Sequence, residues 1–185
     1  MIKLENVSFS FENKPILHDF NMTAAENGVT CIVGKSGIGK STLVDLICSL
    51  KRPDSGKVTT DGKLSVVFQE DRLLPWLSVL DNIKCVSDEE TAKLWISEVG
   101  LSDSFELLPD ELSGGMKRRA ALARALAYSG DALILDEPFN GVDDETKSVL
   151  INIIKDQAKT KPVILITHDK DDIGELADKI VSLDD

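Results

Sequence analysis

The feature that most constrains this chain is a glycine-rich octapeptide, GKSGIGKS, at residues 34–41. A short run of apolar and β-branched residues, Val29–Val33, comes before it, and a helical pattern, Ser41–Leu50, comes after it. A strand, a glycine-rich loop and a helix in this order open a βαβ unit, which predicts a parallel sheet covered by helices. The octapeptide also fits the pattern G-x-x-x-x-G-K-[ST] in full, and this pattern predicts a loop that binds nucleotide phosphates.

The residue types in this loop suit that chemistry. Glycine lets backbone N–H groups turn inward on a phosphate, and a helix that starts near Lys40 adds the positive end of its dipole. Lys40 places a point charge at the β- and γ-phosphates, and the Ser41 hydroxyl can bind Mg²⁺. We therefore expect the nucleotide-binding residues of this segment to be Gly34, Lys35, Ser36, Gly37, Gly39, Lys40, Ser41 and Thr42.

Strand and helix patterns alternate along much of the chain. Further apolar runs are typical of strands that are buried on both faces, at Leu64–Phe68, Ala132–Leu135, Val163–Thr167 and Ile180–Leu183. The clearest helical patterns are Ser113–Tyr128 and Thr146–Lys159. The fold class predicted from this order is α/β, with a mainly parallel sheet.

The N-terminal residues show a different pattern. Apolar and polar residues alternate as far as Phe11, which is typical of a half-buried strand. Residues 12–15 then form a predicted turn into a second strand, Ile16–Thr23. This pattern predicts an antiparallel β subdomain ahead of the phosphate loop.

The stretch 71–112 has no strand pattern, and its candidate helices are Trp76–Leu80 and Thr91–Val99. No repeat, linker or low-complexity segment divides the chain. We therefore expect a single domain, 1–185, into which a helical subdomain is inserted at about residues 71–120.

Composition argues against several classes of protein. The chain has 21 Lys and Arg against 32 Asp and Glu, a net charge of −11, whereas a general nucleic-acid-binding surface is basic. Its three cysteines lie far apart, which is typical of reduced thiols in a reducing compartment. Neither a signal-peptide pattern nor an apolar run of about 20 residues is present. We expect a soluble, cytoplasmic protein without a nucleic-acid partner.

A second motif, DALILDEP at residues 131–138, is an apolar strand that ends in two acids. Such a strand can bring Asp136 beside the phosphate loop, where its carboxylate holds Mg²⁺ directly or through water. Glu137 is then placed to polarise an attacking water as a general base. The alternative is a strand that simply ends in solvated carboxylates.

A third motif, LSGGMK at residues 112–117, opens a long helical pattern. Ser113 can cap this helix, and the bare backbone of Gly114 and Gly115 can approach a phosphate. Residues 112–129 hold four basic side chains and no acid, so we expect a local positive charge at this helix start. A plain helix start is the alternative.

LSGGM followed by KRRAALARAL, together with GKSGIGKS and LILDEP, resembles the ABC ATPase family, the nucleotide-binding engines of ABC transporters. The similarity runs from the first strand to about Ser182. It implies a P-loop NTPase core whose Walker A motif is GKSGIGKS, with ATP and Mg²⁺ as ligands. It also implies a dimer, in which a second copy or a homologous subunit packs head to tail. ATP then lies between the phosphate loop of one subunit and residues 113–115 of the other.

The resemblance gives roles to further residues. Phe11 matches the aromatic position that stacks on adenine, and its alternative role is packing in the core on a strand face. Gln69 matches the glutamine that reaches Mg²⁺ and the attacking water. Asp143 matches the aspartate that crosses to the partner subunit, although it can also cap the following helix. His168 matches the histidine that contacts the γ-phosphate, and by itself it would be a surface histidine.

Met116 and the stretch Gln69–Ile83 resemble the branch of the family that imports nitrate, sulfonate and taurine. In the family, this stretch lies where the coupling helix of an integral membrane permease docks. The apolar residues Leu73–Trp76 suit a groove for an amphipathic helix, or they fill the core of the helical subdomain. The implied location is the cytoplasmic face of the membrane, with the chain bound peripherally.

These motifs predict an ATP-binding and ATP-hydrolysing subunit of an ABC transporter, of the importer type, driven by closure of the head-to-tail dimer. One alternative is a soluble ABC-type ATPase of nucleic-acid or cofactor-assembly machinery, against which the acidic composition counts. Another is a regulatory module that binds nucleotide without hydrolysis. The presence of both Glu137 and His168 counts against that class.

Overall fold

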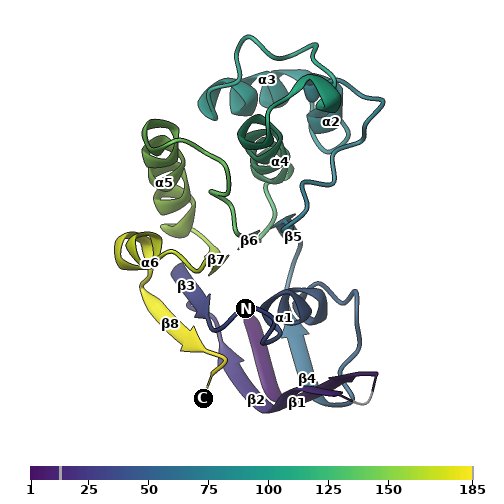
Figure 1. Cartoon of the computed structure of the whole chain (residues 1–185), viewed down its shortest axis with the longest axis vertical. Helices are drawn as coiled ribbons and strands as arrows, with labels where there is room; N and C mark the ends of the chain where they lie inside the picture. Colours follow the sequence, from purple (N-terminus) through teal and green to yellow (C-terminus); the bar gives the residue numbers. More distant parts are fainter. Residues whose placement is uncertain (13, 185) are drawn as a thin grey trace.

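A parallel sheet forms the centre of the molecule, and the glycine-rich loop follows the carboxyl end of one of its inner strands, β3. The computed structural model describes residues 1–12 and 14–184. Neighbouring strands of this sheet all pair in parallel, in the order β5-β6-β7-β3-β8 (Figure 1). Their bounds are β3 (Gly28–Val33), β5 (Leu64–Val67), β6 (Ala132–Asp136), β7 (Pro162–Ile166) and β8 (Lys179–Ser182). The five apolar runs in the sequence are thus confirmed as strands of a parallel sheet, and the α/β fold class is confirmed with them.

A second, antiparallel sheet has the order β2-β1-β4. Its strands are β1 (Ile2–Phe11), β2 (Lys14–Thr23) and β4 (Ser55–Thr60). The predicted N-terminal hairpin is confirmed, and Asn13 of the predicted turn lies outside the described residues. The pattern did not predict β4, whose sequence SGKVTT has one apolar residue and which pairs with β1 along the register Ile2↔Thr60.

The helices lie on both faces of the parallel sheet. They are α1 (Lys40–Ile47), α2 (Val79–Lys84), α3 (Glu89–Glu98), α4 (Gly114–Tyr128), α5 (Asp144–Ala158) and α6 (Lys170–Leu176), with a 3₁₀ turn at Pro109–Glu111. Helices α2, α3 and α4 pack together at the end of the molecule away from the antiparallel sheet (Figure 1). Helix α6 was not predicted from the sequence.

The helix predicted at Trp76–Leu80 is present but lies further along the chain, and Trp76–Ser78 are not helical. Helix α2 begins only at Val79, because the Ser78 side chain caps it by accepting a hydrogen bond from the Asp81 N–H at 3.1 Å. The buried Asn82 side chain accepts from the Leu74 N–H at 2.7 Å and donates to carbonyls of the same segment. These bonds pair backbone N–H and C=O groups of the segment before Ser78, which is therefore an ordered loop without helical hydrogen bonds.

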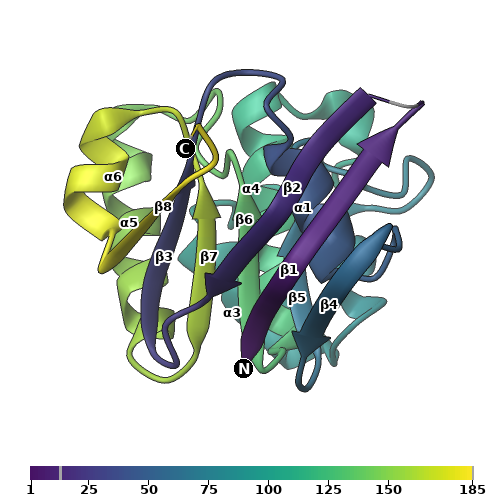
Figure 2. The same cartoon turned by 90° about the horizontal axis from the view of Figure 1, so that it is seen from below.

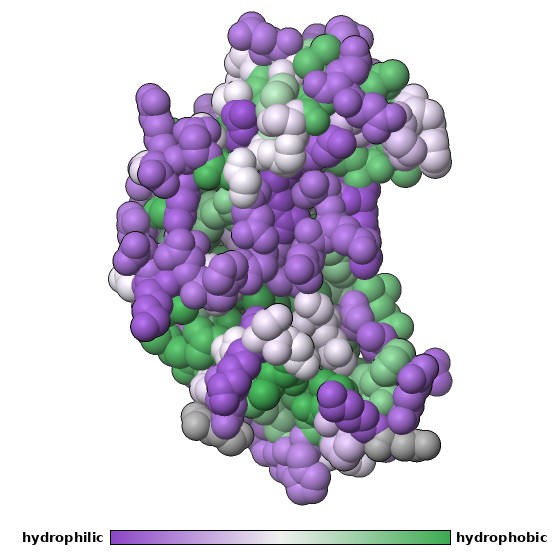
Figure 3. Space-filling view, in the orientation of Figure 1, coloured by the Kyte–Doolittle hydropathy of each residue, from purple (hydrophilic) through white to green (hydrophobic). Residues whose placement is uncertain are grey.

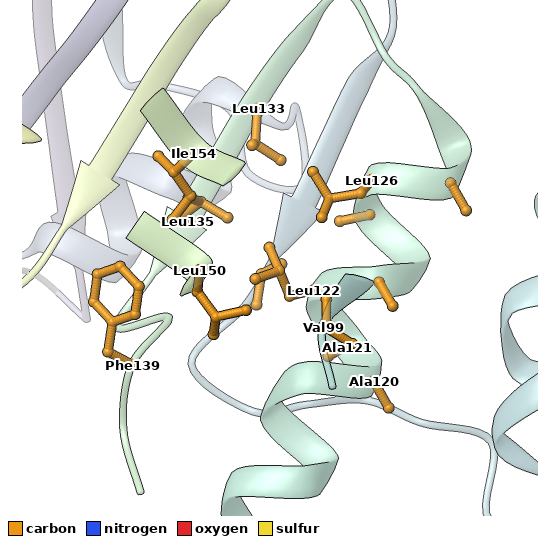
Figure 4. Packing of buried hydrophobic residues seen from close by; sticks show 14 of the residues in the cluster. Val99, Ala120, Ala121, Leu122, Leu126, Leu133, Leu135, Phe139, Leu150 and Ile154 are labelled. Atoms are coloured by element: carbon orange, nitrogen blue, oxygen red, sulfur yellow. The ribbon is translucent and has the colours of Figure 1, made fainter. Parts of the chain in front are cut away.

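Side chains of the parallel sheet alternate between two hydrophobic cores. On one face, residues such as Ile32, Ile134 and Ile164 pack with α1 and the antiparallel sheet, which covers that helix (Figure 2). On the other face, Leu133 and Leu135 pack against residues of α4 and α5 (Figure 4). Because both faces of the sheet are covered, a ligand can approach it at the loops that follow the carboxyl ends of the strands.

In the orientation of Figure 1, a band of hydrophilic residues crosses the middle of the molecule, between the α2–α4 end and the antiparallel sheet (Figure 3). No helix in residues 1–12 and 14–184 combines the length and the apolar composition that a membrane span needs.

Candidate functional site

A pocket lies where the glycine-rich loop meets the carboxyl ends of β5 and β6. Its lining comes from segments that are far apart in the sequence but adjacent at this edge of the sheet: Ser36, Gly37, Gly39, Lys40, Ser41, Thr42, Gln69, Asp136 and Glu137. Each of these residues was a candidate from the sequence. Such a crevice at strand carboxyl ends is where open parallel sheets bind ligands.

The backbone of the loop depends on glycine at the start of α1. Gly39 precedes α1 with φ 119°, in the left-handed region, and a Cβ there would collide with the Ile16 side chain. The Lys40 ammonium donates hydrogen bonds to the carbonyls of Gly34 at 2.7 Å and Lys35 at 3.0 Å. These bonds hold the charge of Lys40 across the loop, beside the N-terminus of α1, where an anion is favoured.

Ser41 and Asp136 join the loop to β6. The Ser41 hydroxyl donates to a carboxylate oxygen of Asp136 at 3.1 Å. Asp136 is 3% exposed, and this burial raises its pKa, an effect that the Ser41 hydrogen bond partly offsets. A nearby cation stabilises the charged form of a buried carboxylate of this kind.

Glu137 and His168 meet beside the pocket, after the neighbouring strands β6 and β7. Glu137 follows β6 with φ 52°, and its N–H donates to the Ile166 carbonyl at the end of β7 at 2.9 Å. Its carboxylate lies 2.9 Å from the Nδ1 atom of His168, whose side chain is exposed. The hydrogen bond to Glu137 and the negative charge of Glu137 raise the pKa of His168. The structure therefore brings the two candidates together.

This contact predicts a pH-dependent signal. A histidine whose pKa is raised by folding contributes stability below its ordinary value of 6.5, and the contribution is lost as the pH rises through the raised pKa. In an NMR titration, we expect an apparent pKa above 6.5 for His168 and a lower one in the Glu137→Gln variant. The matched control is Glu98→Gln, an exposed position on α3. An unchanged pKa in Glu137→Gln contradicts the prediction.

The loop that carries His168 is held by a charged cluster that the sequence did not reveal. Lys147 of α5 pairs with Asp169 at 3.1 Å and with the buried Asp172. The Thr167 hydroxyl donates to Asp172 at 3.2 Å. No spacing pattern connects Lys147 with these acids, so only the fold shows that α5 and α6 support the position of His168.

The segment Ser113–Gly115 lies outside this pocket lining. Ser113 caps α4, as predicted, and accepts from the Met116 N–H at 3.3 Å. A Cβ at Gly115 would collide with the Gly141 carbonyl, so this glycine is needed for a close approach within the chain. Asp143 caps α5 by accepting from the Thr146 N–H at 2.9 Å, and this hydrogen bond lowers the pKa of Asp143. The N-cap alternative for Asp143 is therefore confirmed.

Three of the four basic residues expected to give the start of α4 a positive charge bind carbonyls of the chain itself, and the fourth, Lys117, is half-buried. Arg118 is 3% exposed and points into the protein. Arg119 donates to the carbonyls of Val99 at 3.0 Å and Gly100 at 2.7 Å. Arg124 donates to backbone carbonyls of residues 71–72. These guanidinium groups bind the chain's own carbonyls because helical periodicity turns them toward the neighbouring loops.

Phe11 is 54% exposed at the end of β1, so its alternative role as a core residue is wrong. The Lys51 ammonium lies 5.7 Å from the centre of its ring. Phe11 is not among the residues that line the pocket, and its open face is accessible for stacking.

Comparison with known proteins identifies the family. A sequence profile described as ABC transporter matches residues 17–140 of the chain. The chain belongs to this family. The curated relative SsuB 1 of Rhodococcus jostii, an aliphatic sulfonates import ATP-binding protein, is 37% identical, over 100% of this chain and 79% of its own. CmpD of Synechocystis, a bicarbonate transport ATP-binding protein, is 37% identical, over 98% of this chain and 73% of its own.

Solved structures agree with this assignment. The dimeric bacterial ABC transporter cassette MJ0796 is 27% identical and superposes with a TM-score of 0.88, over 98% of this chain and 94% of its own. The same cassette in a post-hydrolysis state with ADP and Pi has the same TM-score, 0.88. The chain is therefore an ABC ATPase that binds and hydrolyses ATP as a transporter subunit, as the motifs predicted. The relatives favour this function over the nucleic-acid or cofactor-assembly alternative.

Proposed function

We propose that this subunit powers an importer and binds peripherally to the cytoplasmic face of a membrane. The observation that carries its ATPase role is the pocket in which the glycine-rich loop faces Gln69, Asp136 and Glu137. The importer assignment is supported by the names of the relatives, which refer to import of sulfonates and transport of bicarbonate.

The donor set in the pocket fits Mg²⁺. The Ser41 hydroxyl and the Asp136 carboxylate lie 3.1 Å apart, Gln69 lines the same pocket, and Mg²⁺ prefers one or two carboxylates together with phosphate oxygens. Bound there, the ion would offset the negative charge of the phosphates. Lys40 and the loop N–H groups bind the phosphates themselves, through residues 34–42.

Glu137 acts as the general base in this proposal. It orients a water and accepts its proton as the water oxygen bonds to the γ-phosphorus and the bond to the ADP oxygen breaks. His168 is exposed and close to Glu137, so a rotation of its side chain can bring it to the γ-phosphate. Gln69, which follows β5, lines the same pocket and is proposed to reach the same water.

The site is completed by a second subunit in our proposal. Ser113, Gly114, Gly115 and Asp143 are outside the pocket lining of their own chain, which suits a role in the pocket of a head-to-tail partner. That the similar cassette MJ0796 is dimeric supports the presence of a second subunit. The partner is a second copy or a homologous subunit, and Phe11 stacks on the adenine of the bound ATP.

We propose a single domain, 1–185, in which the helical subdomain at about residues 71–120 receives the permease. The docking segment is Gln69–Ile83. Within it, Leu73 packs against the core, whereas Trp76 is 71% exposed. An ordered loop that presents a large exposed apolar side chain is suited to bind an amphipathic helix of the permease.

The docking proposal predicts a loss of membrane association in Trp76→Ala. We expect co-purification with the multi-span permease to fall at least about tenfold, because a buried tryptophan anchor contributes about 2 kcal/mol or more. ATP affinity and thermal stability of the isolated subunit stay unchanged. Leu94→Ala removes another large apolar side chain, 54% exposed on α3, and is the matched control. Equal recovery of the permease with Trp76→Ala and wild type would contradict docking at this segment.

A further inference from the structure

Arg118 is a buried cation whose bonds converge on the catalytic edge of the sheet. Its guanidinium donates to the Phe68 carbonyl at 2.5 Å and to the Gln69 carbonyl at 3.3 Å, just after β5. It also donates to the Glu137 carbonyl, at 2.9 Å from Nε and 2.7 Å from Nη2, and to the Asp136 carbonyl. One side chain from α4 thus binds the backbone after two neighbouring strands.

The burial of this side chain requires those partners. Arg118 is 3% exposed, and a guanidinium stays charged in a protein, so its donors need acceptors when water is excluded. The carboxylate of Asp71, 3.0 Å from Nη1, supplies the opposite charge. The planar fork of arginine can bond several carbonyls at once, which the single ammonium of lysine does not reproduce.

The position of Arg118 bears directly on Glu137. Glu137 has φ 52°, a left-handed conformation that is unfavourable for residues other than glycine and persists only where neighbours hold it. Its N–H is held by the Ile166 carbonyl, and its own carbonyl is held by Arg118. With the backbone in this conformation, the Glu137 carboxylate lies 2.9 Å from the Nδ1 atom of His168.

Arg118 also connects the pocket to the docking segment. Asp71 lies two residues after Gln69, within the stretch proposed to contact the permease. A shift of this loop would move Asp71 relative to the Arg118 guanidinium. The hydrogen bonds from Arg118 to the carbonyls of Gln69 and Glu137 would change with it.

We propose that Arg118 is a positioning residue for ATP hydrolysis, which fixes the backbone of Gln69 and Glu137 and links both to the docking segment through Asp71. It does not line the pocket, so its effect is on the geometry of the residues that do. The inference rests on the roles proposed above for Glu137 and Gln69.

The test compares the steady-state kinetics of Arg118→Gln with those of the wild type. Glutamine has two N–H donors instead of five and no charge. We expect kcat to fall about 10- to 100-fold, because a displaced base loses alignment with its water. KM for ATP should change less than about threefold, since Arg118 does not contact the phosphate loop. Arg118→Lys, which keeps the charge but not the fork, should give an intermediate kcat.

Arg119→Gln is the matched control. Arg119 is adjacent on α4 and also donates to two backbone carbonyls, but these belong to residues 99–100 in the helical end of the molecule. We expect its kcat to stay within about twofold of the wild type. Equal losses of kcat in Arg118→Gln and Arg119→Gln, or a wild-type kcat in Arg118→Gln, overturn the proposal.

Asp71→Asn is a second, milder variant. It tests the positioning role of Arg118 if Arg118→Gln does not fold. We expect a decrease in kcat of about two- to fivefold with an unchanged KM, because the guanidinium loses its counter-charge but keeps its carbonyls. A wild-type kcat in Asp71→Asn overturns the link to the docking segment, and the whole proposal if Arg118→Gln is unfolded.

Glu137→Gln is measured in parallel. If it turns over ATP normally, the proposed base is wrong; if it is inactive while Arg118→Gln is active, only this inference fails.

Discussion

Replacing Glu137 by glutamine should abolish ATP turnover while leaving ATP bound. Glutamine has the same shape but cannot accept a proton, so the loss expected for a general base is about 10²- to 10⁴-fold in kcat. The backbone bonds of Glu137, to the Ile166 carbonyl and from Arg118, do not involve the side chain and should remain. ATP then persists in the site and should hold the head-to-tail dimer closed.

Three measurements check this expectation. Phosphate release gives turnover, filter binding gives retained ATP, and size-exclusion chromatography with ATP and Mg²⁺ gives the fraction of dimer. Glu98→Gln on α3 makes the same chemical change at an exposed site and should behave as the wild type. Normal phosphate release by Glu137→Gln would remove Glu137 as the base, and an inactive variant that stays monomeric with ATP would contradict closure of the dimer.

The parts of the fold that could be predicted are those with strong local patterns. Strands such as β6 and β7 are apolar throughout because both faces of the parallel sheet are covered, and this is visible in the sequence. Strand β4 could not be predicted, because its partly exposed residues gain their stability from pairing with β1, a contact of distant segments. Helix α6 is short and contains a glycine, and its buried Asp172 is stabilised by Lys147 of α5.

The same division holds for the candidate site. The glycine-rich loop and the acids after β6 could be predicted because each is a short motif with its own chemistry. The direction of the arginines after Met116 could not, because a count of basic residues says nothing about which face of α4 each side chain takes. Arg118 therefore looked like part of a surface charge and is instead a buried contact of the pocket's backbone.

Replacing Lys40 by methionine should weaken ATP binding and remove turnover, because methionine keeps the apolar stem but not the charge. A charged hydrogen bond contributes about 1.5–3 kcal/mol, so loss of its contact to the phosphates should weaken ATP affinity about 10- to 100-fold. Within residues 1–12 and 14–184, the hydrogen bonds of the ammonium go to the loop carbonyls of Gly34 and Lys35, so folding should change little. A calorimetric titration with ATP and a thermal melt separate these effects. Lys57→Met, on the exposed part of β4, controls for the loss of one positive charge. Wild-type affinity in Lys40→Met would mean that the phosphates are held elsewhere, whereas weak affinity with a normal melting temperature places them in this loop.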